Sequence, residues 1–458
     1  MLEDEDSKSL KRLEGIKIIP PGPIALKVIN EDSKYIMQSF VRWYPLVVKT
    51  GEGAIVEDVD GNKYIDFNSG LAVLNVGLQH PKVIEAIKNQ AEKLIHYSLT
   101  DFYYEEVVPL AKKLIEITPG THSKKVFFYN SGAEAIEGAI KVVRGYFKGA
   151  RPYIIAFTGS FHGRTLGALS LTSSKPIQRR SFHPLLPCVE HIPYPYCFRC
   201  PYKLDPNSCD CWCIDFIEEW LLNKYVDPEE VSAIVIEPIA GEGGYIVPPK
   251  ECIKKLRELT LKYNILLVVD EVQSGMGRTG KWFAIEHFDI IPDVIALAKG
   301  IASGLPLGAI VGREDIMNLP TGSHATTFSG NPIAVKAASA VIDIIREENL
   351  LLKATLHGEY IMKRLKEMMD RYEVMGDVRG LGLMIGVELV EDRKSKKPAI
   401  KELRWLLNEA FKRGLLVIGA GLSVIRIAPP LVITKEQIDL GLEILESLIK
   451  EANNEVKR

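Results

Sequence analysis

Short apolar runs alternate with longer amphipathic segments through the middle of this 458-residue chain. The runs are rich in β-branched residues, as in "KVFFYN", "YIIAF", "AIVIEP", "ILLVVD", "DVIALA" and "GAIVG". Buried strands that alternate with helices are typical of a mostly parallel sheet covered by helices. The pattern therefore predicts an α/β fold built around one large domain.

The two ends of the chain show a different pattern. The stretch "AIVEDVDGNKYIDF" predicts two alternating strands joined by a turn at residues 60–62. Near the carboxyl end, "GLMIGVELV" and "SVIRIAPP" are strand-like, residues 401–413 have helical patterning, and a final helix is expected from Thr434. A chain of 458 residues also exceeds the usual size of one compact core. We predict that the ends form a smaller α+β domain, which leaves the segments 1–75 (small domain), 76–335 (large domain) and 336–458 (small domain).

The composition excludes several classes of protein. Hydrophobic residues make up 47% and charged residues 25%, with a formal net charge of -2, so nothing predicts a nucleic-acid partner. The start, "MLEDEDSKSLKRLEG", has no apolar core typical of a secretory signal. The longest apolar stretch is interrupted by Asp293, Lys299 and Pro306, which would be costly in a bilayer. We expect a cytoplasmic protein without a membrane partner.

Five of the seven cysteines lie in "CFRCPYKLDPNSCDCWC". The segment 175–213 that contains them is dense in Pro, Cys and Tyr, and we interpret it as an insert outside the sheet. A disulfide framework is not expected in a large intracellular chain. The spacing fits no standard zinc ligand set, so a zinc-like site and thiols or local disulfides that stiffen the loop stay open. We assign no metal site.

The stretch "GMGRTGK", residues 275–281, has the spacing of a phosphate-binding nucleotide loop. The residue after its lysine is Trp282, where a magnesium-binding Ser or Thr would be required, and "DEVQS" separates the loop from the preceding strand. We therefore reject a non-catalytic nucleotide-binding protein as the interpretation of this chain.

An amine and an acid follow two of the predicted strands. Lys299 comes after "DVIALA", and Asp270 ends "ILLVVD". Ligands of parallel sheets bind at the carboxyl ends of strands, so the two side chains are expected to converge. Alone, such a lysine would reach solvent. Together they point to pyridoxal phosphate, which needs a lysine for a Schiff base and an acid for its ring nitrogen. Gln273 would bind the ring hydroxyl.

Two further segments supply what this cofactor requires. Ser131, Gly132 and Ala133 follow a strand and open a helix, where backbone amides bind phosphate and glycine permits close approach. The alternative is an ordinary capped helix. Phe161 would stack on the pyridine ring, unless it is a core aromatic, and Arg164 would bind a substrate carboxylate.

Arg426 interrupts the apolar strand "SVIRIAPP", where an unpaired guanidinium would be costly. It should therefore have an anionic partner. Glu242, in "EPIAGEGGYIVPP", completes the polar set. A purely structural salt bridge is the alternative role for this arginine.

Together these motifs resemble the class III pyridoxal-phosphate-dependent aminotransferases, in the 4-aminobutyrate and ornithine branch. The resemblance runs over nearly the whole chain, through "NSGAEA", "FHGRT", "EPIAGEGG", "VVDEVQSGMGRTGKWFA", "LAKGIASGLPLGA" and "TTFSGNP". It implies a fold type I enzyme that is a homodimer or higher homo-oligomer, with active sites at the subunit interface. The cofactor contacts that it implies are Lys299 (Schiff base), Asp270 (pyridine nitrogen), Gln273 (ring oxygen), Gly132 and Ala133 (phosphate amides), Thr327 of the partner subunit (phosphate), and His162 and Val272.

The resemblance also implies how substrates bind. In that branch the arginine that matches Arg164 binds a substrate carboxylate, and the one that matches Arg426 binds the α-carboxylate of glutamate or 2-oxoglutarate. Glu242 matches the glutamate that neutralises this second arginine when an ω-amino acid is bound. Leu71 stands where ornithine aminotransferases have a tyrosine, which weakens ornithine as the substrate.

We therefore expect an aminotransferase that moves an amino group from an ω-amino acid, 4-aminobutyrate or a similar compound, to 2-oxoglutarate. Lys299, Asp270 and Glu242 are its predicted catalytic residues. An amino-acid racemase or epimerase on the same fold is the alternative, with Glu242 as the base on the opposite face of the cofactor ring.

Overall fold

The computed structural model describes residues 13–456 of the chain. A seven-stranded sheet forms its centre, in the order β4-β10-β9-β8-β7-β5-β6. The strands are β4 (Lys124–Tyr129), β10 (Gly308–Arg313), β9 (Val294–Leu297), β8 (Leu266–Asp270), β7 (Val231–Ile236), β5 (Tyr153–Thr158) and β6 (Val189–Pro193). Neighbouring strands pair in parallel except at β10, which is antiparallel to both β4 and β9. The α/β fold with a mostly parallel sheet is confirmed.

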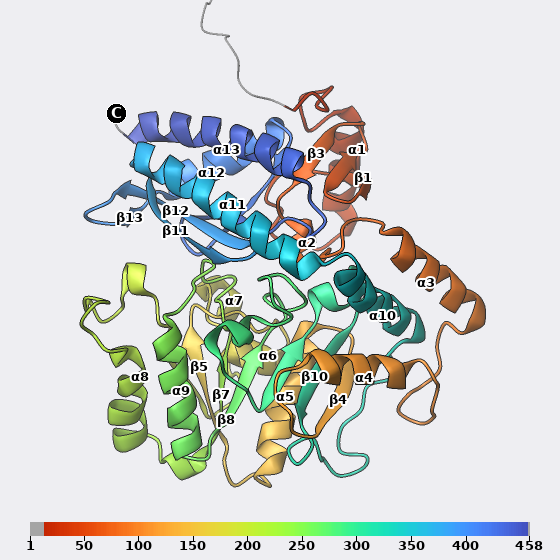
Figure 1. Cartoon of the computed structure of the whole chain (residues 1–458), viewed down its shortest axis with the longest axis vertical. Helices are drawn as coiled ribbons and strands as arrows, with labels where there is room; N and C mark the ends of the chain where they lie inside the picture. The colour runs from red at the N-terminus through yellow and green to blue at the C-terminus, as the bar shows by residue number, and fades with distance from the viewer. Residues whose placement is uncertain (1–12, 457–458) are drawn as a thin grey trace, which may run out of the picture.

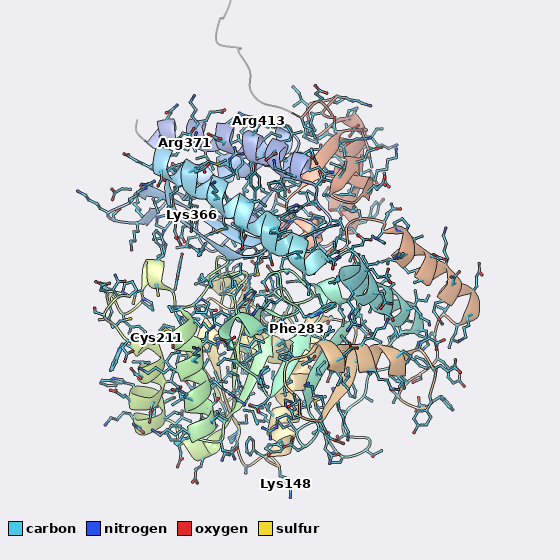
Figure 2. All side chains as sticks on the ribbon, in the orientation of Figure 1. Lys148, Cys211, Phe283, Lys366, Arg371 and Arg413 are labelled. Atoms are coloured by element: carbon cyan, nitrogen blue, oxygen red, sulfur yellow. A yellow bond between two sulfur atoms is a disulfide. The ribbon has the colours of Figure 1, made fainter. Side chains whose placement is uncertain are left out.

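The sheet forms because its strands are apolar on both faces. Every residue of β7 and of β8 is buried, as expected when helices cover both sides. Helix α5 (Gly132–Tyr146) packs against the sheet with a stripe at helical spacing that includes Ile136, Ile140 and Val143. Lys148, just beyond this helix, projects from the surface (Figure 2).

The remaining helices of the large unit lie around this sheet, except α3, which packs against α10 at the side of the molecule (Figure 1). They are α3 (Pro81–Lys93), α4 (Val107–Ile117), α6 (Leu166–Leu171), α7 (Pro176–Arg179), α8 (Trp212–Phe216), α9 (Lys250–Lys262) and α10 (Pro332–Glu347). Short 3-10 helices are η2 (Cys197–Arg199), η4 (Pro228–Glu230), η5 (Ala284–Phe288) and η6 (Lys299–Ile301), and η3 (Ile217–Leu222) is a short π-helix.

A smaller unit combines both ends of the chain (Figure 1). Its carboxyl-terminal elements are α11 (Leu350–Arg371), β11 (Met375–Leu381), β12 (Met384–Asp392), β13 (Lys397–Pro398), α12 (Ile400–Lys412), β14 (Leu415–Leu416), β15 (Ile418–Ala420), β16 (Val424–Ile427) and α13 (Lys435–Val456). The amino-terminal elements are α1 (Pro23–Tyr35), β1 (Val48–Glu52), β2 (Ile55–Asp58), β3 (Lys63–Asp66) and α2 (Ser69–Ala72). Strand β14 pairs in parallel with β3, so the two ends share one sheet.

The predicted hairpin is present, because β2 and β3 pair antiparallel across residues 59–62. The expected helices over 401–413 and from Thr434 are α12 and α13. The smaller α+β unit is therefore confirmed, whereas its boundaries at residues 75 and 336 stay predictions. The first twelve residues of the segment 1–75, which include most of the charged start, lie outside the described part of the chain.

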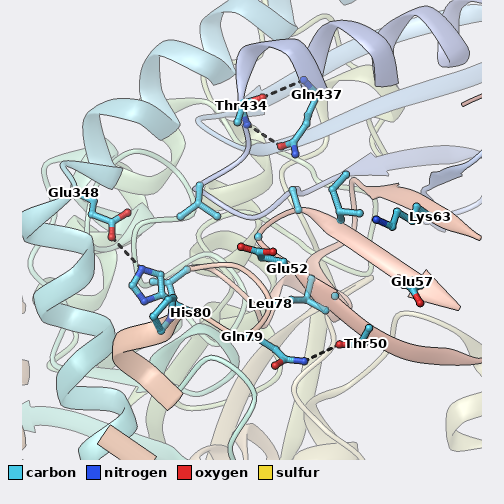
Figure 3. A pocket seen from close by; sticks show the side chains of 17 residues that line it. Thr50, Glu52, Glu57, Lys63, Leu78, Gln79, His80, Glu348, Thr434 and Gln437 are labelled. Carbon is cyan, nitrogen blue, oxygen red and sulfur yellow. Dashed lines mark hydrogen bonds and ion pairs between the residues drawn. The ribbon is translucent and has the colours of Figure 1, made fainter. Parts of the chain in front are cut away.

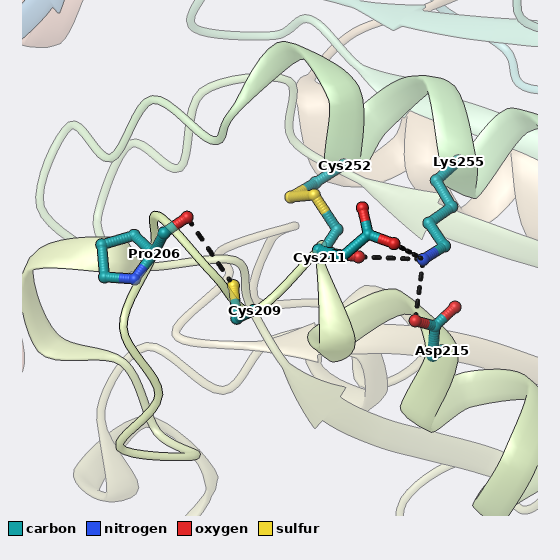
Figure 4. The surroundings of a disulfide bond; sticks show 7 residues. Pro206, Cys209, Cys211, Asp215, Cys252 and Lys255 are labelled. Carbon is teal, nitrogen blue, oxygen red and sulfur yellow. Dashed lines mark hydrogen bonds and ion pairs between the residues drawn. A yellow bond between two sulfur atoms is a disulfide. The ribbon is translucent and has the colours of Figure 1, made fainter.

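The cysteine-rich segment differs from its prediction in two ways. Residues 175–213 do not lie wholly outside the sheet, since β6 pairs in parallel with β5 at the sheet edge. The run "VEHIP" is too short and mixed for a strand to be recognised from pattern alone. Cys211 also forms a disulfide with Cys252 of α9, beside Lys255 and its partner Asp215 (Figure 4). This bridge was not expected, because its second cysteine lies 41 residues away and outside the cluster.

Cys197, Cys200, Cys209 and Cys213 are free thiols around a cavity of about 400 Å³. Within residues 13–456, no group of three or more His, Cys, Asp or Glu side chains is arranged to hold a metal ion. None of the described helices is both long enough and apolar enough to cross a membrane.

Asp293, which precedes β9 and is 2% exposed, joins three elements of the large unit. Its carboxylate accepts hydrogen bonds from the Leu267 backbone of β8 at 2.8 Å, from Arg257 of α9 at 2.7 Å and from Arg313 of β10 at 2.8 Å. A buried carboxylate is tolerated only when it is paired in this way.

We expect Asp293→Ala to lower the free energy of unfolding by about 3 kcal/mol, because it leaves two guanidinium groups and a buried amide without their acceptor. Asp315→Ala is the matched control, since Asp315 pairs with the same Arg313 at 2.6 Å on the surface. Asp315→Ala should lower the free energy of unfolding by less than about 1 kcal/mol. Chemical denaturation of the two variants measures both values, and equal losses would contradict the structural role of Asp293.

Candidate active site

A cavity of about 410 Å³ opens at the carboxyl ends of the central strands. It is lined by residues from five predicted cofactor segments, which are Ser131, Gly132 and Ala133; Phe161, His162 and Arg164; Asp270; Val272 and Gln273; and Lys299. The structure thus brings together residues that lie up to 168 positions apart, from Ser131 to Lys299. This is the edge of the sheet at which ligands of α/β folds bind.

Asp270, the last residue of β8, is 5% exposed and held from two sides. Its Oδ2 lies 2.7 Å from His162 Nδ1, and its Oδ1 accepts the Val272 backbone N–H at 3.0 Å. Burial lowers the pKa of His162, but the hydrogen bond and charge of Asp270 outweigh burial, so that this pKa is raised above its ordinary value. The acid and the imidazole therefore form a buried hydrogen-bonded pair that fixes the direction of both side chains.

Glu237 lines the same cavity as this pair and was not recognised from the sequence. It follows the fully buried strand β7 and accepts hydrogen bonds from the backbone N–H groups of Phe161 and Gly241, both at 3.1 Å. Burial raises its pKa to about 7, with His162 acting in the opposite direction. An acid directly after six buried strand residues was the available signal, the same signal that identified Asp270.

Lys299 follows β9 and adopts a left-handed backbone conformation, with φ of 44°. Such a conformation is unfavourable for a residue with a side chain, and residues that adopt it are enriched at functional sites. Burial lowers the pKa of Lys299, and the positive charge of Arg426 lowers it further. The amine is therefore more often uncharged, and more nucleophilic, than that of a surface lysine.

The start of α5 provides a concave backbone surface. Ser131 caps the helix, since its Oγ accepts the Glu134 backbone N–H at 3.2 Å. A Cβ on Gly132 would lie 2.9 Å from Val272 Cγ1, so glycine is required there by packing. The ordinary capped helix is therefore present, and its first residues also line the cavity, so an amide cradle for a phosphate at this helix start stays a prediction.

Two buried polar atoms of the site have no hydrogen-bond partner among the described residues. They are Oε1 of Gln273 and Nε2 of His162. Buried polar groups usually have a hydrogen-bond partner, so these two atoms are available to bind a ligand or water. Together with the lysine, the acid and the cradle, these atoms match the polar groups of pyridoxal phosphate, and the residues present therefore fit this cofactor.

Glu242 and Arg426 form an ion pair with Oε1 and Nη1 2.8 Å apart. The anionic partner expected for Arg426 is therefore present, and the guanidinium is only 2% exposed. The two residues do not line the cavity of Lys299, but they influence the pKa of its amine. Burial raises the pKa of Glu242, but the positive charges of Arg426 and of other cations lower it by more. The pKa of this carboxyl is therefore below its usual range.

Three predicted residues are exposed in the single chain. Arg164 is exposed and lies over the Phe161 ring, with 5.4 Å between guanidinium carbon and ring centroid. Leu71 is 48% exposed and Thr327 is exposed, and neither lines the cavity. Phe161 itself is half-buried and lines the cavity, so it is not a core aromatic. The roles of Leu71 and Thr327 stay predictions.

The "GMGRTGK" loop has a structural role. Arg278 is fully buried, and it donates hydrogen bonds to Asn75 Oδ1 at 2.7 Å, to Ser69 Oγ at 3.2 Å and to the Pro429 carbonyl. The loop therefore joins the large and small units. A second cavity of about 660 Å³ lies between β1–β3 and the start of α13, beside the His80–Glu348 pair, and contains none of the predicted residues (Figure 3).

The chain matches the family model described as Aminotransferase class-III over residues 36–449. It is 44% identical to an alanine/serine racemase of Pyrococcus horikoshii, over 95% of this chain and 92% of that protein. A leucine/methionine racemase of Thermococcus litoralis is 45% identical, over 90% and 92% of the two chains. A probable 4-aminobutyrate aminotransferase of Bacillus subtilis is 40% identical, over 88% and 92%.

Solved structures share the whole fold. The omega transaminase of Pseudomonas jessenii in complex with PMP aligns with a TM-score of 0.88 and 30% identity, over 93% of this chain and 98% of that one. A Bacillus anthracis aminotransferase aligns with a TM-score of 0.86 and 30% identity, over 93% and 99%.

We expect pyridoxal phosphate followed by borohydride to label Lys299 selectively near neutral pH. The reason is the lowered pKa of Lys299. At neutral pH the amines of surface lysines, with an ordinary pKa of 10.5, are almost all protonated, whereas a larger fraction of the Lys299 amine is unprotonated and can react. Peptide mass spectrometry locates the label. Lys299→Ala should remain folded and lose it, and equal labelling of exposed lysines such as Lys148 would count against the assignment.

Proposed function

The chain belongs to the class-III aminotransferases, which are pyridoxal-phosphate-dependent enzymes, and we propose that it transfers the amino group of an ω-amino acid such as 4-aminobutyrate to 2-oxoglutarate. The single observation that supports this choice best is the ion pair of Glu242 with the buried Arg426. An arginine with a removable counter-ion serves two kinds of substrate, one that brings a carboxylate to it and one that does not.

When bound, pyridoxal phosphate withdraws electrons from the carbon that bears the substrate amine, so that its proton can be removed. Lys299 would bind the cofactor and then accept and return that proton, because its lowered pKa leaves the amine free to act as a base. Asp270, fixed by His162, would keep the ring nitrogen protonated, and Gln273 would hydrogen-bond the ring oxygen. The amides of Gly132 and Ala133 would hold the phosphate.

Two arginines favour a dicarboxylate as one substrate. Arg426 would bind the α-carboxylate of 2-oxoglutarate, and the exposed Arg164 would bind its second carboxylate. With 4-aminobutyrate, which has one carboxylate, Glu242 would stay on Arg426 and keep the guanidinium neutralised. Its lowered pKa keeps Glu242 ionised, as a counter-ion must be.

Racemisation or epimerisation of an amino acid is the second candidate. It is favoured by the two racemases at 44% and 45% identity. Glu242 would then be the second base, on the face of the cofactor opposite Lys299. The ion pair with Arg426 makes Glu242 a weaker base than a free glutamate, which is why we place transfer first.

We also propose a cytoplasmic homodimer. Large apolar side chains stay exposed in the single chain, and exposed clusters of this kind mark protein interfaces. They include Met37, Phe40, Val41, Tyr97, Phe102, Tyr103 and Phe328. Thr327 is exposed and precedes the exposed Phe328, which supports a place for it at the interface with the partner subunit.

The deciding experiment is a pair of assays on the cofactor-loaded enzyme. With 4-aminobutyrate and 2-oxoglutarate, we expect stoichiometric glutamate. With a single enantiomer of alanine, serine or leucine and no oxo acid, we expect no sustained inversion, since the weakened base at Glu242 cannot return a proton efficiently from the opposite face. Chiral chromatography measures both products, and inversion without glutamate formation would establish the racemase instead.

A further inference from the structure

Glu242 has a second cation beside it, which neither the sequence nor the proposed function has assigned. Its Oε1 binds Arg426, and its Oε2 lies 3.7 Å from Nζ of Lys175. The two cations differ in burial, because the Arg426 side chain is 2% exposed and that of Lys175 is 36% exposed. Glu242 thus lies between an inner and an outer positive charge.

We propose that Lys175 is a positioning residue that receives the Glu242 carboxylate whenever Arg426 binds a substrate carboxylate. The inference deepens the proposed function and rests on it for the identity of the substrates. It assigns to Lys175 no contact with substrate or cofactor.

The physical reason is the cost of leaving Glu242 without a partner. The Glu242 side chain is only 20% exposed, so once it leaves Arg426 its charge is poorly hydrated. The binding free energy of a substrate carboxylate at Arg426 must therefore offset the loss of the ion pair between Arg426 and Glu242. A lysine already 3.7 Å from the second carboxylate oxygen lowers that cost, because the glutamate exchanges one cation for another with a small movement.

The segment that holds Lys175 is fixed in place. Lys175 precedes the short helix α7, whose Arg179 donates hydrogen bonds to the carbonyls of Ser170 at 3.0 Å and Thr172 at 2.8 Å. Ser174 binds Gln178 at 2.7 Å across the same turn. The Lys175 amine therefore moves mainly through its own side chain, and it stays within reach of Glu242.

The outer side of this pair opens to a cavity of about 710 Å³. Lys175 and Trp43 line it, together with Gly243, which follows the glutamate. The Lys175 amine lies 5.8 Å from the centre of the Trp43 ring, so the amino-terminal segment limits where this side chain can go. Space beside Lys175 gives the glutamate a place to move to, whereas Arg426 is enclosed.

The test uses Lys175→Met, which removes the charge and keeps the length, and Lys175→Arg, which keeps the charge. Glutarate, a dicarboxylate that cannot react, is titrated into the cofactor-loaded enzymes by calorimetry. We expect Lys175→Met to weaken glutarate binding roughly fivefold, the upper range for a partly exposed ion pair. It should raise the KM for 2-oxoglutarate by a similar factor and leave the KM for 4-aminobutyrate unchanged. Lys175→Arg, which keeps the charge, should leave the glutarate affinity and the KM for 2-oxoglutarate near their wild-type values.

A double substitution separates this role from direct contact with substrate. In a Glu242→Gln background the side chain at position 242 has no negative charge for Lys175 to bind. Lys175→Met should then no longer change the affinity for glutarate. An effect that persists there, an equal change in both KM values, or no change in glutarate binding would overturn the inference. Lys255→Met is the matched control, because Lys255 of α9 forms an ion pair with Asp215 of α8 at 2.7 Å. This substitution should alter neither KM.

The two proposals fail in different ways. If the wild-type enzyme transfers no amino group from 4-aminobutyrate to 2-oxoglutarate, the proposed function is wrong, while glutarate titration still measures the contribution of Lys175. If the wild-type enzyme transfers the amino group and binds glutarate, but the Lys175 variants behave as wild type, only the inference about Lys175 is wrong. A wild-type enzyme that binds no glutarate overturns that inference as well.

Discussion

The hydrogen-bonded pair of Asp270 and His162 is the interaction on which the rest of the site depends. A carboxylate that is 5% exposed at the end of β8 would be strongly unfavourable alone, and the imidazole 2.7 Å away supplies a hydrogen bond to it. His162 comes from the loop after β5, so the pair joins two strands that are separated in the sheet by β7. Its free Nε2 and the unpartnered amide oxygen of Gln273 leave a polar surface shaped for a ligand.

Two charged clusters of different character influence the amine of Lys299. Asp270, His162 and Glu237 are enclosed and fixed, which suits groups that hold a cofactor in one orientation. Glu242, by contrast, lies between Arg426 and Lys175 and is partly exposed, which suits a group that must change partners. Both clusters act on Lys299, whose pKa is lowered by burial and by Arg426 against the opposing carboxylates. We therefore propose that the site combines rigid cofactor recognition with an adaptable carboxylate pocket.

Much of the fold and the cofactor site could be predicted because the relevant signals are local. A fully apolar run followed by an acid, as at Asp270, identifies a strand end, and Gly132 after "KVFFYN" identifies a helix start. Strand β6, the Cys211–Cys252 bridge, Glu237 and Lys175 were missed. Each depends on neighbours distant in sequence: β6 becomes a strand through its pairing with β5, and Lys175 gains a role only because Glu242 lies beside it.

The sequence by itself determined the alternation of buried strands and helices, the positions of the acid and the amine at strand ends, and the need of Arg426 for an anion, because these follow from burial and periodicity along the chain. Only the tertiary structure decided which charges meet. It paired Asp270 with His162 and placed Glu242 between two cations, and it joined β3 to β14 from opposite ends of the chain. Pairing over such separations is set by strand order and helix packing, which no single segment encodes.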